Sequence, residues 1–412
     1  MRFRKFRDSS LMRTVRLAII TTHPIQYHIP WYQALSGTPD VEVKVFYGVI
    51  PDPVLQGSGF DIPFTWDIPM FEGYHSWVSV RSNEKLLKGG VFFLVTRDLE
   101  SALTKWRPDV ALVTGWNSLF LFQAVWICRK HHIPIIVRGE VNGLKPRSRL
   151  IHRYHDYLFK RFDAFLAIGK QNHKYYLEHQ VPSGSIYDAP YFIDNARFAH
   201  HAAQERQRRS QLRDKFGIGK DEYCLLFVGK IIEKKRIMDL LYSIERYHND
   251  LHTLRVLVVG SGKQMAATRE YAERAGLPVS FLGFLNQGQI VQAYAVADLL
   301  VLPSDGRETW GLVVNEAMAA GLPALVSDQI GCAADLIIPG KTGYMYRMGN
   351  LEALGDKLVL LSRSPRRSSA MGRNAQKHVL DNYSVDRAVL GTLEAVGFAT
   401  GERHREAHTR ER

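Results

Sequence analysis

The feature of this chain that most limits its fold is a repeated alternation of short apolar runs with longer helical stretches. "VRLAIITTH", "VEVKVFYG", "DVALVTG", "PIIVRGE" and "AFLAIG" are near-continuous apolar runs rich in β-branched residues. Such runs are typical of strands that are buried on both faces of a parallel sheet. Stretches with helical spacing, such as "LFLFQAVWICRKHH", lie between them. This alternation predicts a doubly wound α/β domain.

The alternation stops after Ile193 and then resumes, which indicates a second domain. The segment that follows Ile193 is charged and poor in strand formers, and we interpret it as a linker with one polar helix. Six more strand runs come after it: "YCLLFVGK", "LRVLVVGSG", "VSFLGF", "DLLVLPSD", "PALVSD" and "TGYMYR". A chain of 412 residues also exceeds the usual size of a single core. The predicted parts are a basic tail 1–14, a first domain 15–195, a linker 196–221, a second domain 222–383, a terminal helix 384–400 and a charged tail 401–412.

Cysteine usage and hydropathy indicate a cytoplasmic protein. Cys128, Cys224 and Cys332 are far apart in apolar surroundings, without the spacing of a disulfide framework or a zinc site. We therefore expect buried thiols and a reducing compartment. The longest strongly apolar runs are about ten residues, whereas a membrane span needs roughly 20. Neither a transmembrane helix nor a secretory signal is expected.

The charge balance points to an anionic partner. Lys and Arg number 54 against 41 Asp and Glu, a net charge of +13. Basic residues concentrate in 1–16, in the aromatic segment 145–162 and in 204–217. We interpret the third segment as a solvated linker. For the first two, a solvated surface and attraction to an anionic membrane are equally good interpretations. No nucleic-acid reading module is recognisable, so nucleic acid is not an expected partner.

Residues that directly follow the strands are the first candidates for a site, because parallel sheets bind ligands beyond the carboxyl ends of their strands. In "FVGKIIEKKR" a strand ends at Gly229 and Lys230, and Lys235 follows just before a helical run. Two ammonium groups at a helix entrance suit a diphosphate. From this segment alone, solvated lysines on a surface turn are the better interpretation.

The segment "PSDGRETWGLVVNEAMAAGLP" carries a stronger signal. A helix is predicted to start near Gly311, which leaves the first backbone N–H groups without an intrahelical acceptor and open to an anion. Glu308 then lies in the loop before the helix, and Glu316 lies more than one turn inside it. Capping of the helix would explain Glu308. A solvent-exposed position is a poor explanation for a glutamate at position 316, because its neighbours in the sequence are mostly apolar.

These pieces occur in an order that closely resembles the C-terminal domain of family 4 retaining glycosyltransferases of the GT-B fold. The resemblance covers roughly Tyr223 to Tyr346, and the pair of glutamates with seven intervening residues is its most specific part. "TTHPIQYHIPW" and "IPIIVRGE" extend the resemblance weakly to the first half. It implies two Rossmann-like domains that face a central cleft, with a C-terminal helix that crosses back to the first domain.

The resemblance also implies roles for individual residues of the second domain. Lys235 would contact the donor diphosphate, helped by Lys230, where many relatives have arginine. Glu316 would accept hydrogen bonds from the ribose, and Glu308 would act at the transferred sugar as a catalytic residue. The backbone N–H groups of three residues would also bind the diphosphate: Gly311, Leu312 and Val313. Gly283 and Phe284 would lie near the base.

The first domain departs from the family pattern. The glycine-rich loop that many relatives have after the first strand is replaced by "THPIQYHIP", and "RGE" stands where many have a histidine. His23 is therefore a catalytic candidate, and Arg138 and Glu140 are acceptor candidates. For each, a satisfied turn residue is an equally good interpretation. Histidine pairs such as His152 and His155 are interpreted as surface residues rather than metal ligands.

The predicted function is transfer of a sugar, with retention, from a nucleoside diphosphate sugar to an acceptor hydroxyl. A UDP- or GDP-sugar is the expected donor, and a lipid-linked or saccharide acceptor is expected, in polysaccharide or glycolipid biosynthesis at the inner face of the plasma membrane. No Asp-x-Asp pair is present, so neither a metal nor another cofactor is implied. Front-face attack and a covalent intermediate both stay open. The alternatives are another GT-B enzyme, such as a nucleotide-sugar epimerase or a phosphorylase, and a non-catalytic nucleotide-sugar-binding protein.

Overall fold

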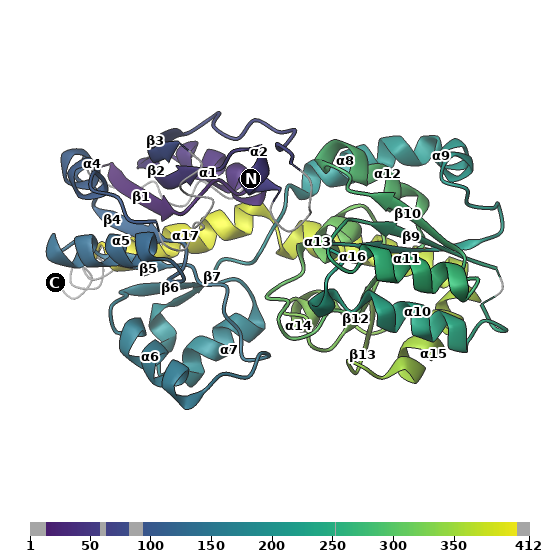
Figure 1. Cartoon of the computed structure of the whole chain (residues 1–412). Helices are drawn as coiled ribbons and strands as arrows, with labels where there is room; N and C mark the ends of the chain where they lie inside the picture. Colours follow the sequence, from purple (N-terminus) through teal and green to yellow (C-terminus); the bar gives the residue numbers. More distant parts are fainter. Residues whose placement is uncertain (1–13, 58–62, 82–93, 252, 402–412) are drawn as a thin grey trace, which may run out of the picture.

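The structure is a computed structural model that describes residues 14–57, 63–81, 94–251 and 253–401. The predicted tails, 1–14 and 401–412, lie outside the described residues except for positions 14 and 401. Two α/β domains, each built on a parallel sheet, lie side by side (Figure 1). The C-terminal helix α17 runs from the second domain back along the first. This is the predicted two-domain arrangement.

The first domain is built on a seven-stranded sheet with the order β3-β2-β1-β4-β5-β6-β7. Every pairing in it is parallel. The five predicted strands are present, and β3 and β7 are additional. The strands are β1 (Val15–Thr21), β2 (Val41–Ile50), β3 (His75–Arg81), β4 (Val110–Val113), β5 (Ile135–Val137), β6 (Ala164–Ala167) and β7 (Ile186–Asp188). The helices are η2 (Gln26–His28), α1 (Ile29–Ser36), α2 (Pro53–Gln56), α4 (Leu99–Trp106), α5 (Leu119–Lys130), α6 (Arg149–Phe159), α7 (Lys170–Glu178) and η4 (Ser183–Ser185).

The second domain has a six-stranded parallel sheet with the order β10-β9-β8-β11-β12-β13, and all six strands were predicted. They are β8 (Tyr223–Val228), β9 (Leu254–Val259), β10 (Val279–Gly283), β11 (Leu299–Leu302), β12 (Ala324–Ser327) and β13 (Gly343–Tyr346). The helices are α8 (Asn195–Gln207), α9 (Arg209–Lys215), η5 (Glu233–Lys235), α10 (Ile237–Arg246), α11 (Met265–Arg274), α12 (Gln287–Val296), α13 (Leu312–Ala319), α14 (Ala333–Leu336), α15 (Leu351–Ser362), α16 (Pro365–Asn382) and α17 (Val385–Ala399).

Burial on both faces explains the near-continuous apolar strands. In β1, Ala18 and Ile20 belong to one core cluster, whereas Leu17 and Ile19 belong to another. Successive side chains of a strand point to opposite faces, so a sheet covered by helices on both sides needs apolar residues at every position. The three cysteines are buried free thiols, as predicted.

The segment predicted as a solvated linker with one polar helix forms two helices, α8 and α9, that pack against the second domain. Its arginines explain the difference. Arg209 Nη2 lies 2.8 Å from Asp298 Oδ1, and Arg213 Nη1 lies 3.4 Å from Oδ2 of the same carboxylate. Both guanidinium groups also donate to the carbonyl of Val296 at the end of α12. Cations favour the C-terminus of a helix, so the charged run binds the domain instead of standing in solvent.

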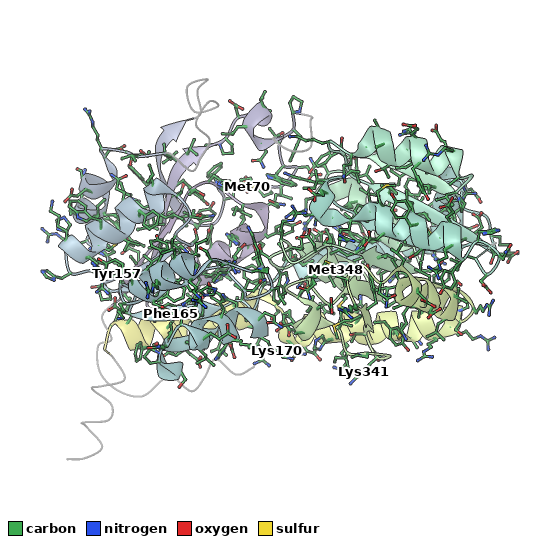
Figure 2. The ribbon with its side chains drawn as sticks, turned by 60° about the horizontal axis from the view of Figure 1, so that its bottom comes forward. Met70, Tyr157, Phe165, Lys170, Lys341 and Met348 are labelled. Atoms are coloured by element: carbon green, nitrogen blue, oxygen red, sulfur yellow. The ribbon has the colours of Figure 1, made fainter. Side chains whose placement is uncertain are left out.

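Helix α17 crosses back to the first domain, as predicted. It begins after Ser384, whose side chain accepts from the Arg387 N–H at 3.3 Å, and it packs against α1 and β7. Gly391 allows this close packing, because a Cβ there would lie 2.0 Å from the Asp188 carbonyl oxygen. Side chains of the two domains meet between them, and Lys170 lies at their boundary (Figure 2). Its backbone N–H donates to Asp335 Oδ1 of the second domain at 3.1 Å.

Candidate active site

A cavity of about 260 Å³ lies between the two domains at the carboxyl ends of their strands. Loops after β5 and β7 contribute the first-domain residues, and loops after β8 and β11 contribute those of the second. The lining residues are Glu140, Tyr191, Lys235, Glu308, Thr309, Trp310, Gly311, Leu312 and Val313. Open parallel sheets bind ligands at this position. The fold therefore brings Glu140 and Lys235, which are far apart in the sequence, together with Glu308 and the start of α13.

Lys235 and Glu308 form an ion pair in the wall of this cavity. Lys235 Nζ lies 2.6 Å from Glu308 Oε2, and Lys234 Nζ lies 3.7 Å from the same oxygen. Gly229 leaves room for the lysine, because a Cβ there would lie 3.3 Å from Lys235 Cε. Lys230 is partly buried and is not one of the lining residues found in the described part of the chain.

The N-terminus of α13 forms the adjoining wall. Gly311 precedes the helix with φ 98°, a left-handed conformation that favours glycine, and a Cβ there would lie 3.0 Å from Ile330 Cγ2. Leu312 and Val313 form the first turn and line the cavity. Backbone N–H groups of a first turn have no intrahelical acceptor and carry the positive end of the helix dipole. With the Lys235 ammonium beside them, they can hold an anion such as a diphosphate.

Glu316 lies deeper in α13 and is 1% exposed. Its Oε1 accepts from the Tyr27 hydroxyl at 2.7 Å and from Gln287 Nε2 at 3.5 Å, and its Oε2 accepts from the Tyr294 hydroxyl at 2.6 Å. Burial raises the pKa of the Glu316 carboxyl, and the hydrogen bonds from Tyr294 and Tyr27 act against that rise. Tyr27 belongs to η2 of the first domain. The carboxylate thus joins the two domains.

Of the two predicted base-proximal residues, Phe284 contacts the first domain. Gly283, with φ 69°, ends β10, and its carbonyl accepts from the Gly260 N–H at 2.8 Å. The ring of Phe284 lies 4.6 Å from the ring of Phe64, at an interplanar angle of 35°. A segment of the first domain therefore covers this end of the second sheet.

Of the first-domain candidates, Glu140 lines the cavity and Arg138 does not. Arg138 is 1% exposed, and its guanidinium lies 4.6 Å from the ring centre of Tyr191. Its Nη1 lies 3.3 Å both from Glu140 Oε1 and from His28 Nε2. In this arrangement aromatic rings cover Arg138, and its guanidinium lies behind Glu140. The acceptor contacts of Arg138 and Glu140 both stay predictions.

His23 lies two residues beyond the end of β1 and is not among the described residues that line the cavity. Its Nδ1 lies 2.9 Å from Thr22 Oγ1, and burial lowers the pKa of its imidazole. The surface interpretation of the histidine pairs is wrong for His155. That side chain is buried, and its Nδ1 lies 2.7 Å from the Tyr175 hydroxyl.

Sequence reasoning missed Tyr191 and the side chain of Trp310, which both line the cavity. Tyr191 follows β7, a strand that was not predicted, so no site residue was predicted in the loop after it. Trp310 Nε1 donates to Asn315 Oδ1 at 2.8 Å, and its ring packs against Gly169 of the first domain, where a Cβ would lie 2.4 Å from the ring. The signal for Gly169 was present, since it directly follows a predicted strand.

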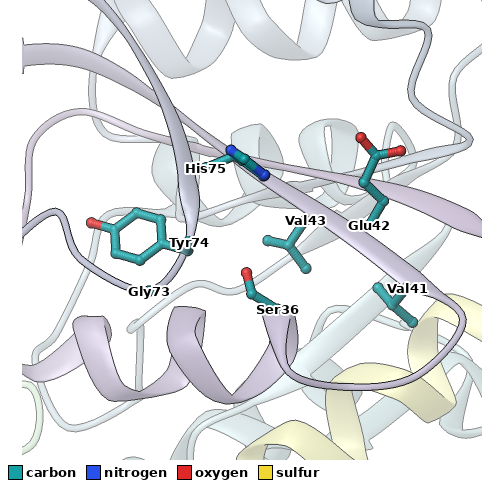
Figure 3. Close-up of a pocket in the computed structure, with 7 residues that line it drawn as sticks. All are labelled: Ser36, Val41, Glu42, Val43, Gly73, Tyr74 and His75. Atoms are coloured by element: carbon teal, nitrogen blue, oxygen red, sulfur yellow. The ribbon is translucent and has the colours of Figure 1, made fainter.

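A larger cavity, of about 450 Å³, lies at the other end of the first sheet (Figure 3). It adjoins the end of α1 and the amino ends of β2 and β3. The lining residues are Ser36, Val41, Glu42, Val43, Gly73, Tyr74 and His75. It lies away from the carboxyl ends of the strands, and Glu42 is paired with Arg16 at 3.1 Å. We assign no function to it.

This architecture is the α/β GT-B fold, with two Rossmann-like domains and a helix that returns to the first. A solved structure of Anabaena Alr3699/HepE in complex with UDP matches it with a TM-score of 0.69 and 15% identity, over 93% of this chain and 99% of that one. A glycosyltransferase from Rickettsia africae ESF-5 matches with a TM-score of 0.70 and 13% identity, over 94% and 98% of the two chains.

Residues 208–378 match the family model described as glycosyl transferases group 1. Sulfoquinovosyl transferase SQD2 of Arabidopsis thaliana is 34% identical over 296 residues, which are 67% of this chain and 54% of that protein. A GDP-mannose-dependent alpha-(1-6)-phosphatidylinositol monomannoside mannosyltransferase of Mycolicibacterium smegmatis is 25% identical, over 49% and 53% of the two chains. The chain spans about half the length of the curated relatives it matches.

Proposed function

We propose that the chain is a family 4 glycosyltransferase that moves a sugar, with retention, from a nucleoside diphosphate sugar to an acceptor hydroxyl. The observation that carries this proposal is the cavity in which Lys235, Glu308 and the first turn of α13 face Glu140 of the other domain. The glycosyltransferase match of the second domain and the glutamate pair support it.

The groups around the cavity suit the departure of a nucleoside diphosphate. Negative charge builds on the diphosphate as the glycosidic bond breaks, and preorganised positive groups stabilise such charge most effectively. Lys235 and the N–H groups of Leu312 and Val313 supply that positive field. Glu308 contacts Lys235 and can accept hydrogen bonds from sugar hydroxyls at the reacting end. Glu140, across the cavity, is our candidate for contact with the acceptor.

The donor is proposed to be a UDP- or GDP-sugar. HepE was solved with UDP and with UDP-glucose, and the mycobacterial relative is named for GDP-mannose. We propose that the chain acts without a metal, because the sequence has no Asp-x-Asp pair and the Lys235 ammonium with the start of α13 can neutralise the diphosphate.

Calorimetry with UDP, GDP and ADP, followed by transfer assays with the sugars of the nucleotide that binds, tests the proposal. Binding of one nucleoside diphosphate, together with a product whose anomeric configuration by NMR matches that of the donor, is the expected result. Glu308→Gln should keep nucleotide binding and lose transfer. A chain that binds no nucleotide refutes the proposal. Release of a sugar epimer without an acceptor favours an epimerase, and formation of a sugar phosphate from a saccharide and inorganic phosphate favours a phosphorylase.

We also propose that the acceptor is a lipid-linked or saccharide molecule at an anionic membrane surface. Helix α6 supports this, because Leu150 and Tyr157 are 75% and 60% exposed and Ile151 and Tyr154 are exposed beside them. Arg149 and Arg153 are exposed on the same helix, and Lys160 and Arg161 follow it. Tyr157 lies toward the end of the first domain that is away from the second (Figure 2). Exposed apolar side chains flanked by cations suit the interface of an anionic bilayer.

Sedimentation with phosphatidylglycerol vesicles tests the membrane proposal. We expect Leu150→Gln to reduce the bound fraction severalfold. Leu390→Gln is the matched control, because Leu390 is also exposed but lies on α17, which covers the opposite face of the first sheet. Among the described residues no helix is both long and apolar enough to cross a bilayer. Equal binding by both variants, or binding lost only on deletion of residues 1–13, would rule out the α6 surface.

A further inference from the structure

The cavity opens onto only part of the predicted donor site. Lys235 and the first turn of α13 line it, but Glu316, Gly283 and Phe284, the positions predicted for ribose and base, are not among its lining residues in the described part of the chain. Glu316 is almost completely buried. The diphosphate region is therefore accessible, whereas the Glu316 carboxylate at the ribose position is covered by protein.

The group that fills the ribose position comes from the other domain. The Tyr27 hydroxyl donates to Glu316 Oε1 at 2.7 Å across a sequence separation of 289 residues. The other donors to this carboxylate, Tyr294 and Gln287, belong to α12 of the second domain. A movement of the first domain would thus remove Tyr27 and leave Tyr294 and Gln287 in place.

The base position is covered in the same way by residues 63–67, which we call the strap. Phe64 of the strap lies against Phe284 at 4.6 Å between ring centres. Asn286 Nδ2 donates to the Thr65 carbonyl at 2.9 Å, and the Gly288 N–H donates to Asp67 Oδ2 at 2.9 Å. In these three contacts the covering groups belong to the first domain and the covered groups belong to the second.

We infer that Tyr27 holds the place of a ribose hydroxyl on Glu316 in this structure, and that donor binding requires the first domain to withdraw Tyr27 and the strap. This inference rests on the proposed function. A buried carboxylate without donors is costly, so the closed chain needs a group like Tyr27 when no nucleotide is present. A phenol hydroxyl and a ribose hydroxyl donate in the same way, so binding exchanges one donor for another. Tyr27 is a positioning residue that sets how readily the nucleoside region opens.

Tyr27→Phe tests the inference, because it removes the hydroxyl and keeps the ring. The affinity for whichever of UDP, GDP or ADP binds the wild-type chain should rise about tenfold, since a hydrogen bond to a charged group is worth about 1.5–3 kcal/mol and tenfold corresponds to about 1.4 kcal/mol. The affinity for inorganic diphosphate should not change, since its region is already open. Tyr47→Phe is the matched control. It removes a tyrosine hydroxyl that makes a contact of 2.8 Å with the Tyr74 hydroxyl, away from the site.

Hydrogen exchange on the wild-type chain gives a second readout that does not depend on the variant folding. Adding the nucleoside diphosphate should speed exchange in residues 25–28 and in the strap, whereas inorganic diphosphate should not. Unchanged or weaker nucleotide binding by Tyr27→Phe overturns the inference alone, as does unchanged or slower exchange in both segments. Absence of nucleotide binding in the wild-type chain and in Tyr27→Phe overturns the proposed function and the inference with it.

Discussion

Replacing Lys235 with methionine separates the role of this side chain in stability from its role in binding. The Lys235–Glu308 pair is short, at 2.6 Å, and its side chains are only 10% and 13% exposed. Removing one partner of a buried pair typically costs about 3–5 kcal/mol, because the other charge stays buried without compensation. Lys234 lies 3.7 Å from the same carboxylate oxygen and compensates in part. We therefore expect a loss near the lower limit, about 3 kcal/mol.

The double variant Lys235→Met/Glu308→Gln should recover most of that stability, because no unpaired charge is then buried. Nucleoside diphosphate affinity should behave differently. It should fall at least tenfold in both variants that lack the Lys235 ammonium, since a hydrogen bond to a charged group is worth about 1.5–3 kcal/mol. Glu308→Gln alone should bind the nucleotide nearly as the wild type does. Urea unfolding and calorimetry measure the two quantities on the same four proteins.

Two outcomes would refute this reasoning. If the double variant regained nucleotide affinity together with stability, Lys235 would act only by keeping the fold intact. If Lys235→Met bound the nucleotide as tightly as the wild type, the ammonium would lie outside the diphosphate site despite lining the cavity. Either result would mean that only the first turn of α13 stabilises the negative charge of the diphosphate.

Three further predictions concern Glu316, Gly169 and His155. Glu316→Gln should leave the melting temperature equal or higher, because burial disfavours the charge and raises the pKa of the carboxyl, yet weaken nucleotide binding at least tenfold; a clear loss of stability would contradict this. Gly169→Ala places a Cβ 2.4 Å from the Trp310 ring and should cost about 1–3 kcal/mol in urea unfolding, whereas no change would mean that the domains do not touch there in solution. Burial lowers the pKa of His155 from 6.5 to about 4, so between these pH values the unfolded chain binds more protons than the folded chain. The free energy of unfolding should therefore decrease as the pH is lowered from about 6.5 to 4. His155→Asn should make that fall shallower, and an unchanged melting profile against pH would contradict the burial argument.

The strands that could be predicted are those buried on both faces. In β8 every position belongs to a core cluster, and in β1 the four positions from Leu17 to Ile20 do, so the sequence has no polar interruptions in these runs. The two missed strands lie at the edges of the first sheet. β3 reads "HSWVSVR", with polar residues between apolar ones, and β7 has only three residues. An edge strand pairs on one side only and needs less apolar surface, which makes its pattern weaker.

The second-domain part of the site was predictable because its residues lie close together in the sequence. Glu308, the start of α13 and Glu316 fall within nine residues, and their order is specific. Tyr27 and Tyr191 carry no such signal. Each is an aromatic residue in a loop or a short helix of the first domain, and its role depends on a partner more than a hundred residues away. Hydrophobic periodicity describes a single element, so it cannot indicate which loops of two domains will meet.

Both predicted ligand-binding carboxylates are already paired within the chain. Glu308 contacts Lys235, and Glu316 accepts from Tyr27 and Tyr294. A charged side chain that is buried without a partner is strongly destabilising, so the charged groups of a deeply buried site need partners within the chain. Binding of a donor would then exchange partners, and the measured affinity would be a difference between two sets of contacts. A substitution of Tyr27 strengthens binding on this account and a substitution of Glu316 weakens it, although the two residues share one hydrogen bond. Substitutions at the two ends of this one hydrogen bond should therefore change the nucleotide affinity in opposite directions. That result would distinguish an exchange of partners from binding to a site that is already open.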